Sequence, residues 1–180
     1  MKMDKDKLEE LLEARDHANE ELEKMRTPVT VLFSDIRGST AYFEKKGDLE
    51  GMAMINRHNG ILFPVIEAEG GYVVKTIGDS IMARFDDPVA AVKAAAGMQR
   101  ALDGDRQGRP VMEQIRIRVG LHTGLGLLKD GDVFGDVVNA ASRVQHQAQT
   151  DQVLITDVLV EAARSAGFEC ARMEGAELRG

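Results

Sequence analysis

Two aspartates stand at the polar ends of otherwise apolar segments and could together bind a metal ion. Asp35 follows the strand-like run VTVLFS, and Asp79 lies in the turn between YVVKTI and SIMARF. Carboxylate oxygens are hard ligands, and Mg²⁺ in proteins typically uses one or two of them together with substrate phosphates. A single aspartate in such a position is more often a turn former or a cap. The position shared by both residues favours the metal-site interpretation.

A second pair of polar side chains lies four residues apart in the segment DVVNAASR. Asn139 and Arg143 would project from one face of a helix. The ordinary interpretation is two solvated polar residues. The alternative is an amide that orients a substrate and a cation that stabilises charge developing on a phosphate.

The apolar pattern predicts the elements that would position these side chains. We expect strands at 29–35, 114–124 and 151–156, a hairpin at 72–85, and helices at 38–71, 87–104, 136–149 and 157–167. The first of these helices is split near Gly47, Asp87 caps the second, and residues 168–180 are ambiguous between a strand and a loop. The leading order, βαββαβ, indicates an α+β fold with a ferredoxin-like antiparallel sheet, helices on one face, and additional elements. In such a sheet the first strand neighbours the second hairpin strand, so Asp35 and Asp79 could converge.

The segment 3–26 predicts a separate N-terminal helix. Its apolar positions alternate three and four residues apart, which is the spacing of a coiled coil, although Arg15 interrupts the stripe. The stripe comprises Leu8, Leu11, Arg15, Ala18, Leu22 and Met25. A solvated single helix is the alternative, but we favour a short parallel coiled coil that ends at Thr27 and Pro28.

Composition limits the class of protein. The 180 residues are 43% hydrophobic and 29% charged, with a net charge of −7, which argues against a general nucleic-acid binder. An anionic substrate is still compatible, because local cations and metal ions can outweigh the global charge. The single Cys170 cannot form an internal disulfide, so we expect a cytoplasmic protein. No apolar run approaches the roughly 18 residues that span a bilayer, so we expect no membrane contact by this chain, although a longer parent could be anchored.

Four segments in the same order resemble the successive motifs of class III nucleotidyl cyclases. They are FSDIRGST, KTIGDSIMARF, RIRVGLHTG and DVFGDVVNAASR, and the resemblance covers roughly residues 29–180. It implies that the carboxylates of Asp35 and Asp79, with the backbone carbonyl of Ile36, hold two divalent cations, Mg²⁺ or Mn²⁺. The reaction implied is attack of the ribose 3′-oxygen on the α-phosphate of a nucleotide, with pyrophosphate leaving.

The resemblance also assigns the residues that select and handle the substrate. Lys75 and Asp132 match the family positions that read the base, and lysine with aspartate implies ATP as the substrate and cyclic AMP as the product. Lysine can donate to adenine N1 and aspartate can accept from the adenine amino group, whereas guanine presents the opposite pattern. Asn139 would orient the ribose and Arg143 would meet the α-phosphate. Arg118 matches a triphosphate contact, although Arg116 lies two residues earlier and could be confused with it. Arg179 would replace the family lysine that contacts the triphosphate.

In this family the sites lie between two subunits, so the resemblance implies a homodimer with two equivalent sites. One chain would supply the metal carboxylates, and its partner would supply Lys75, Asp132, Asn139 and Arg143. We expect residues 1–27 to form the signalling coiled coil and 28–180 the catalytic domain, with its C-terminal end truncated and a sensor or regulatory domain upstream in a longer parent. The alternatives are a guanylate cyclase, a silent cyclase-like module that binds nucleotide as a sensor, or a structural coiled-coil adaptor.

Overall fold

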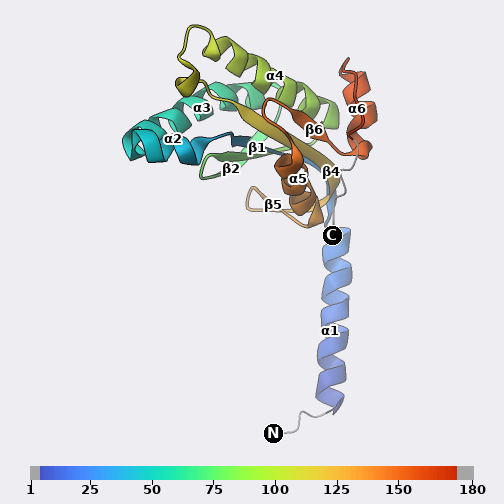
Figure 1. Cartoon of the computed structure of the whole chain (residues 1–180). Coiled ribbons are helices and arrows are strands. Elements are labelled where there is room, and N and C mark those ends of the chain that lie inside the picture. The colour runs from blue at the N-terminus through green and yellow to red at the C-terminus, as the bar shows by residue number, and fades with distance from the viewer. Residues whose placement is uncertain (1–4, 174–180) are drawn as a thin grey trace.

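A six-stranded sheet forms the centre of the domain in the computed structural model, which describes residues 5–173 (Figure 1). The strands are β1 (Thr27–Ile36), β2 (Tyr72–Ile77), β3 (Ser80–Phe85), β4 (Ile117–Lys129), β5 (Asp132–Phe134) and β6 (Val153–Ile155). They are ordered β2-β3-β1-β4-β5, all antiparallel, while β6 pairs in parallel with β4. The first four strands have the order of a ferredoxin-like core, as predicted.

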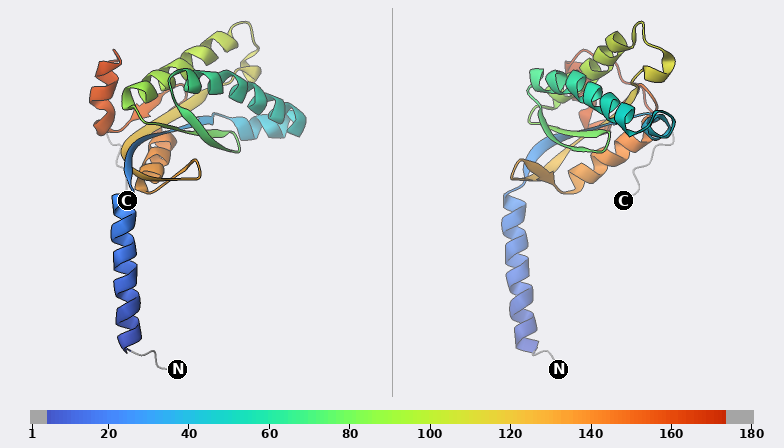
Figure 2. Two further views of the ribbon diagram at one scale, coloured as in Figure 1. Left: turned by 180° about the vertical axis from the view of Figure 1, so that it is seen from behind. Right: turned by 90° about the vertical axis from the view of Figure 1, so that its left-hand side faces the viewer.

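Helices cover both faces of this sheet (Figure 2). The helices are α1 (Lys5–Lys24), α2 (Ser39–Lys46), α3 (Asp48–Ala68), α4 (Pro88–Arg106), α5 (Asp136–Gln147) and α6 (Val160–Ser165), with 3₁₀ turns at Val111–Glu113 and Asp157–Leu159. Helices α3 and α4 pack together on one face, and α5 packs against β4 and β1 on the other. The helices of the predicted βαββαβ core therefore lie on one face, as expected, and α5 is an additional element that covers the other face.

The sequence of strand β1 explains why helices can pack on both faces of the sheet. Leu32 and Ile36 belong to the hydrophobic cluster under α3 and α4, whereas Val29, Val31 and Phe33 belong to the cluster under α5. Alternate side chains of a strand point to opposite faces. The uninterrupted apolar run of β1 therefore fits a strand that is covered by helices on both sides.

Two tight hairpins set the ends of the strands. Ile77 pairs with Ser80 around Gly78, whose φ of 62° suits the first position of a type II′ turn. Lys129 pairs with Asp132 around the two-residue loop 130–131, in which both φ angles are positive, as in a type I′ turn. Strand β4 continues to Lys129, within the segment 125–135, where the sequence pattern indicates a strand end and a turn.

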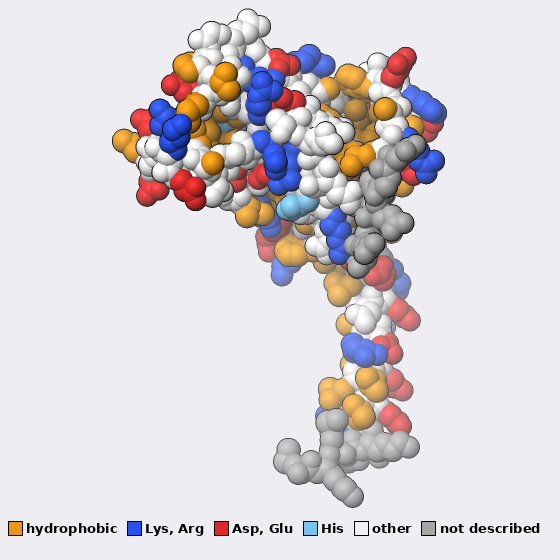
Figure 3. Space-filling view, in the orientation of Figure 1, with side chains coloured by type: hydrophobic (Ala, Val, Ile, Leu, Met, Phe, Trp, Pro, Cys, Tyr) orange, Lys and Arg blue, Asp and Glu red, His pale blue; other side chains and the backbone are white. Residues whose placement is uncertain are grey.

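Helix α1 projects away from the domain (Figures 1 and 2). Apolar side chains line one side of it and acidic side chains line another (Figure 3). The exposed large apolar residues of this helix and the turn after it are Leu8, Leu11, Leu12, Leu22 and Met25. The predicted helix is confirmed, and the coiled coil stays a prediction. No helix within residues 5–173 is both long and apolar enough to cross a membrane.

Candidate active site

The two predicted metal carboxylates lie at the same edge of the sheet. Ser34 of β1 pairs with Ile81 of β3, so Asp35 lies opposite Ser80, the residue that follows Asp79. The Ser80 hydroxyl donates a hydrogen bond of 2.8 Å to Asp35 Oδ1. The pairing of β1 with the hairpin therefore brings Asp35 and Asp79 together, as the ferredoxin-like order predicted.

The donor set fits a divalent cation that shares its coordination with a substrate. Asp79 Oδ2 is buried and has no hydrogen-bond partner within residues 5–173. A buried carboxylate oxygen without a partner is costly, and a cation can satisfy it. The same part of the chain holds no cluster of three or more His, Cys, Asp or Glu side chains suited to a metal. Two carboxylates and a backbone carbonyl suit Mg²⁺ that completes its shell with water and phosphate oxygens.

Arg118 is the second partner of Asp35. The two residues are register partners on β4 and β1, and Arg118 Nε and Nη2 lie 3.1 and 2.9 Å from Asp35 Oδ2. Arg118 Nη1 also donates to the carbonyl of His146 near the end of α5, at 3.0 Å. The residue predicted to bind triphosphate therefore forms an ion pair with Asp35, a predicted metal ligand of its own chain. Arg116 points elsewhere, to Asp151, so the structure separates the two arginines.

His58 lies beneath this edge on the inner face of α3. It is fully buried, its Nδ1 lies 3.0 Å from Asn59 Oδ1, and its Nε2 has no partner among the described residues. Burial lowers the pKa of His58, and this effect is partly offset by the Asn59 hydrogen bond and by the negative charges of Asp79 and Asp35. The negative charges of both carboxylates therefore favour the protonated form of the imidazole, against the effect of burial.

The predicted base-reading residues lie side by side. Lys75 Nζ is 2.5 Å from Asp132 Oδ2 across the gap between β2 and β5. A register shift between Val73 and Lys75 places Lys75 opposite Met82, whose side chain packs in the cluster under α5. This bulge aims the ammonium group at β5. The hydrogen bond from Lys75 lowers the pKa of the Asp132 carboxyl, so Asp132 is an ionised acceptor at neutral pH.

Asn139 and Arg143 are exposed on α5, one turn apart. The opposite face of the helix is anchored by Val137, Ala141 and Val144, which are buried. Close packing of α5 on the sheet depends on Gly120 of β4, because a Cβ atom there would lie 2.1 Å from the backbone nitrogen of Gln145. The helix thus presents an amide and a guanidinium to solvent rather than to Asp35 of the same chain.

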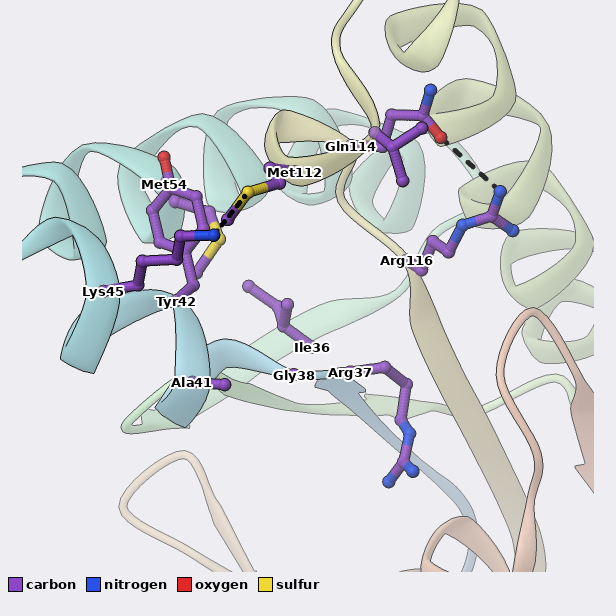
Figure 4. Close-up of a pocket in the computed structure, with 11 residues that line it drawn as sticks. Ile36, Arg37, Gly38, Ala41, Tyr42, Lys45, Met54, Met112, Gln114 and Arg116 are labelled. Atoms are coloured by element: carbon purple, nitrogen blue, oxygen red, sulfur yellow. Dashed lines mark hydrogen bonds between the residues drawn. The ribbon is translucent and has the colours of Figure 1, made fainter.

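A cavity of about 300 Å³ lies between the end of β1, at Ile36, and helix α2 (Figure 4). Its described lining includes Ile36 and the cations Arg37, Lys45 and Arg116, but no carboxylate. Figure 4 shows the Arg37 side chain pointing away from the other lining residues. Neither Lys75 nor Asp132 lines this cavity, so it is separate from the position where a base would be read.

Two residues of this region escaped the sequence analysis, and one predicted residue cannot be placed. Ser80 follows Asp79 directly, so the GDS segment itself held the signal. The position of His58 beneath the carboxylates had no signal in the neighbouring sequence, because it depends on how α3 packs on the sheet. Arg179 lies outside the described residues.

The sequence and the fold were compared with known proteins. Residues 22–180 match the family model described as the adenylate and guanylate cyclase catalytic domain. An adenylate cyclase of Anabaena cylindrica is 33% identical over 150 residues, which cover 73% of this chain and 30% of that protein. The chain thus spans less than a third of this relative.

Solved structures agree with the sequence comparison. The adenylyl cyclase CyaB of P. aeruginosa superimposes with a TM-score of 0.67 at 26% identity, covering 78% of this chain and 82% of that one. The guanylyl cyclase Cya2 superimposes with a TM-score of 0.68 at 26% identity, covering 84% and 88%. The chain belongs to the adenylate and guanylate cyclase catalytic domain family. Because both substrate types share this fold equally well, the fold does not choose between ATP and GTP.

Proposed function

We propose that this chain is an adenylate cyclase module that converts ATP to 3′,5′-cyclic AMP and pyrophosphate in a homodimer. The observation that supports ATP is the Lys75–Asp132 pair. A lysine donor and an ionised aspartate acceptor, 2.5 Å apart, match the N1 acceptor and amino donor of adenine. Guanine would place its N1–H against the ammonium and its O6 against the carboxylate, leaving unpaired polar groups, which usually costs about 1–3 kcal/mol each.

The residues of the chain would divide the chemistry among them. Asp35 and Asp79, with the Ile36 carbonyl, would hold two divalent cations, Mg²⁺ or Mn²⁺. When bound, these cations neutralise phosphate charge and lower the cost of ionising the ribose 3′-hydroxyl. Asn139 would orient the ribose so that its 3′-oxygen faces the α-phosphorus. Arg143 would stabilise negative charge on the α-phosphate as the bond to the pyrophosphate oxygen breaks.

The exposure of Asn139 and Arg143 supports a site shared between two chains. Neither side chain has a hydrogen-bond or ion-pair partner within residues 5–173, whereas Asp35 faces inward to Ser80 and Arg118. A second copy related by a twofold axis would bring its α5 to these carboxylates and form two equivalent sites. The exposed leucines of α1 would form a parallel coiled coil between the copies, and an upstream domain in a longer parent would act through it.

Substrate choice is tested by comparing the cyclic products that the purified chain forms from ATP and from GTP, with Mg²⁺ and with Mn²⁺. We expect cyclic AMP to predominate with both metals. Lys75→Met should reduce the preference for ATP by about tenfold to one hundredfold, the equivalent of one unpaired polar group. Lys129→Met is the matched control, because Lys129 pairs with Asp132 in strand register but donates it no side-chain hydrogen bond. A wild-type preference for GTP would refute the assignment.

Sharing of the site is tested by mixing two inactive chains, Asp79→Ala and Arg143→Ala. At equal amounts, half of the randomly formed dimers are mixed, and each mixed dimer keeps one of its two sites intact. The mixture should therefore recover about one quarter of the wild-type activity. If the mixed chains are folded and form dimers but stay inactive, each site belongs to a single chain.

A further inference from the structure

Both oxygens of Asp35 accept hydrogen bonds from side chains of the same chain. Oδ1 accepts the Ser80 hydroxyl at 2.8 Å, and Oδ2 accepts Nε and Nη2 of Arg118 at 3.1 and 2.9 Å. Asp79 differs, because its Oδ2 is buried without a partner in the described part of the chain. The two metal carboxylates are therefore unequal: one already has a counter-ion and the other does not.

The Arg118–Asp35 ion pair is well shielded and well anchored. The two side chains are only 15% and 19% exposed, so water and salt screen them less than a surface pair. Charge-assisted hydrogen bonds with two nitrogens are the stronger kind, and adjacent strands hold the partners in register. The third hydrogen bond, to the His146 carbonyl, fixes the guanidinium against the end of α5.

A divalent cation at Asp35 would compete with this guanidinium for the same oxygen and be repelled by its charge. We infer that the Arg118 guanidinium occupies Asp35 in place of a metal ion when no nucleotide is bound. Asp35 then becomes available to a metal ion only when a triphosphate binds the Arg118 guanidinium instead. This inference rests on the proposed function, since it needs a nucleoside triphosphate and a metal at this edge. Arg118 is then a positioning residue that makes metal and nucleotide bind cooperatively, and the coupling is reciprocal.

The inference is tested on the purified chain by Mn²⁺ titration without nucleotide, counting free Mn²⁺ by electron paramagnetic resonance. Arg118→Gln should tighten nucleotide-free Mn²⁺ binding by about tenfold, because it removes the competing cation. Arg118→Lys keeps the charge but loses the two-nitrogen geometry, so its affinity should lie between those of the wild type and Arg118→Gln. Arg116→Gln should change nothing, because Arg116 pairs with Asp151 and Gln114.

A second titration contains the 3′-deoxy analogue of ATP, which lacks the attacking hydroxyl. The analogue should tighten Mn²⁺ binding to the wild type by at least tenfold more than to Arg118→Gln. Equal enhancement in both, or nucleotide-free Mn²⁺ binding to folded Arg118→Gln that is no tighter than in the wild type, would overturn the inference. Asp35→Asn separates this failure from that of the proposed function: Mn²⁺ binding that is unaffected by Asp35→Asn shows that the metal site itself was misassigned.

Discussion

Gly120 lies where β4 passes directly beneath α5, and we expect that even an added methyl group there greatly reduces the proposed cyclase activity. A Cβ atom on Gly120 would lie 2.1 Å from the backbone nitrogen, 2.3 Å from Cα and 2.6 Å from Cβ of Gln145. Non-bonded heavy atoms normally approach to about 3.5 Å. The obstacle is helix backbone, which cannot rotate aside as a side chain can. Gly120→Ala therefore requires α5 to move by about 1 Å or more.

The substitution should reduce both the stability of the fold and the activity, because α5 holds several of the proposed site residues. Overpacking of this kind usually costs about 1–3 kcal/mol, and backbone contact puts this site at the upper end. For a chain of this size, that corresponds to a decrease in melting temperature of roughly 4–10 °C. The effect on activity should be larger, since α5 presents Asn139 and Arg143, and its His146 carbonyl holds Arg118. A misplacement of about 1 Å can reduce turnover by about one hundredfold.

The assay pairs urea unfolding with cyclic AMP production at saturating ATP. Gly124→Ala is the matched control, because it lies on the same strand and faces α5, but its nearest atoms would be 3.4 Å away. Gly124→Ala should lose much less of both properties. If Gly120→Ala keeps wild-type stability and turnover, the close approach of α5 to β4 does not position the proposed catalytic side chains, and the reasoning is wrong.

Three further predictions concern stability and assembly. Lowering the pH from about 7.5 to about 5 should weaken the fold, because burial lowers the pKa of His58 below 6.5 and the unfolded chain then binds a proton that the folded chain does not. Urea titrations at both pH values should show a smaller loss for His58→Leu, and equal losses would contradict this. Asp87→Ala removes the acceptor of the Val89 N–H at the start of α4, at 2.9 Å, and should cost about 1 kcal/mol in urea unfolding. Asp86→Ala is its control, because the exposed Asp86 side chain pairs with Arg84 and caps no helix; equal costs would argue against the cap. Leu11→Glu, on the exposed stripe of α1, should shift sedimentation from dimer toward monomer, and an unchanged mass would count against the coiled coil.

The sequence by itself determined the helix caps, turns and strands that depend only on neighbouring residues. The Asp87 cap before Pro88, the Gly78 turn and the apolar run of β1 act over a few residues, so each could be predicted without knowledge of the rest. The order of these elements predicted the ferredoxin-like core and the convergence of Asp35 and Asp79. The four motifs predicted which side chains belong to the candidate site.

Only the tertiary structure decided the contacts that join distant segments. Arg118 meets Asp35 across 83 residues, and Lys75 meets Asp132 across 57, and such pairings depend on strand register rather than on local preference. The place of α5 on the opposite face depends on whether β4 lets a helix backbone approach, which Gly120 permits. The burial of His58 under the carboxylates depends likewise on how α3 packs on the sheet. These features depend on packing between residues that are far apart in the chain, so no short segment of the sequence can predict them.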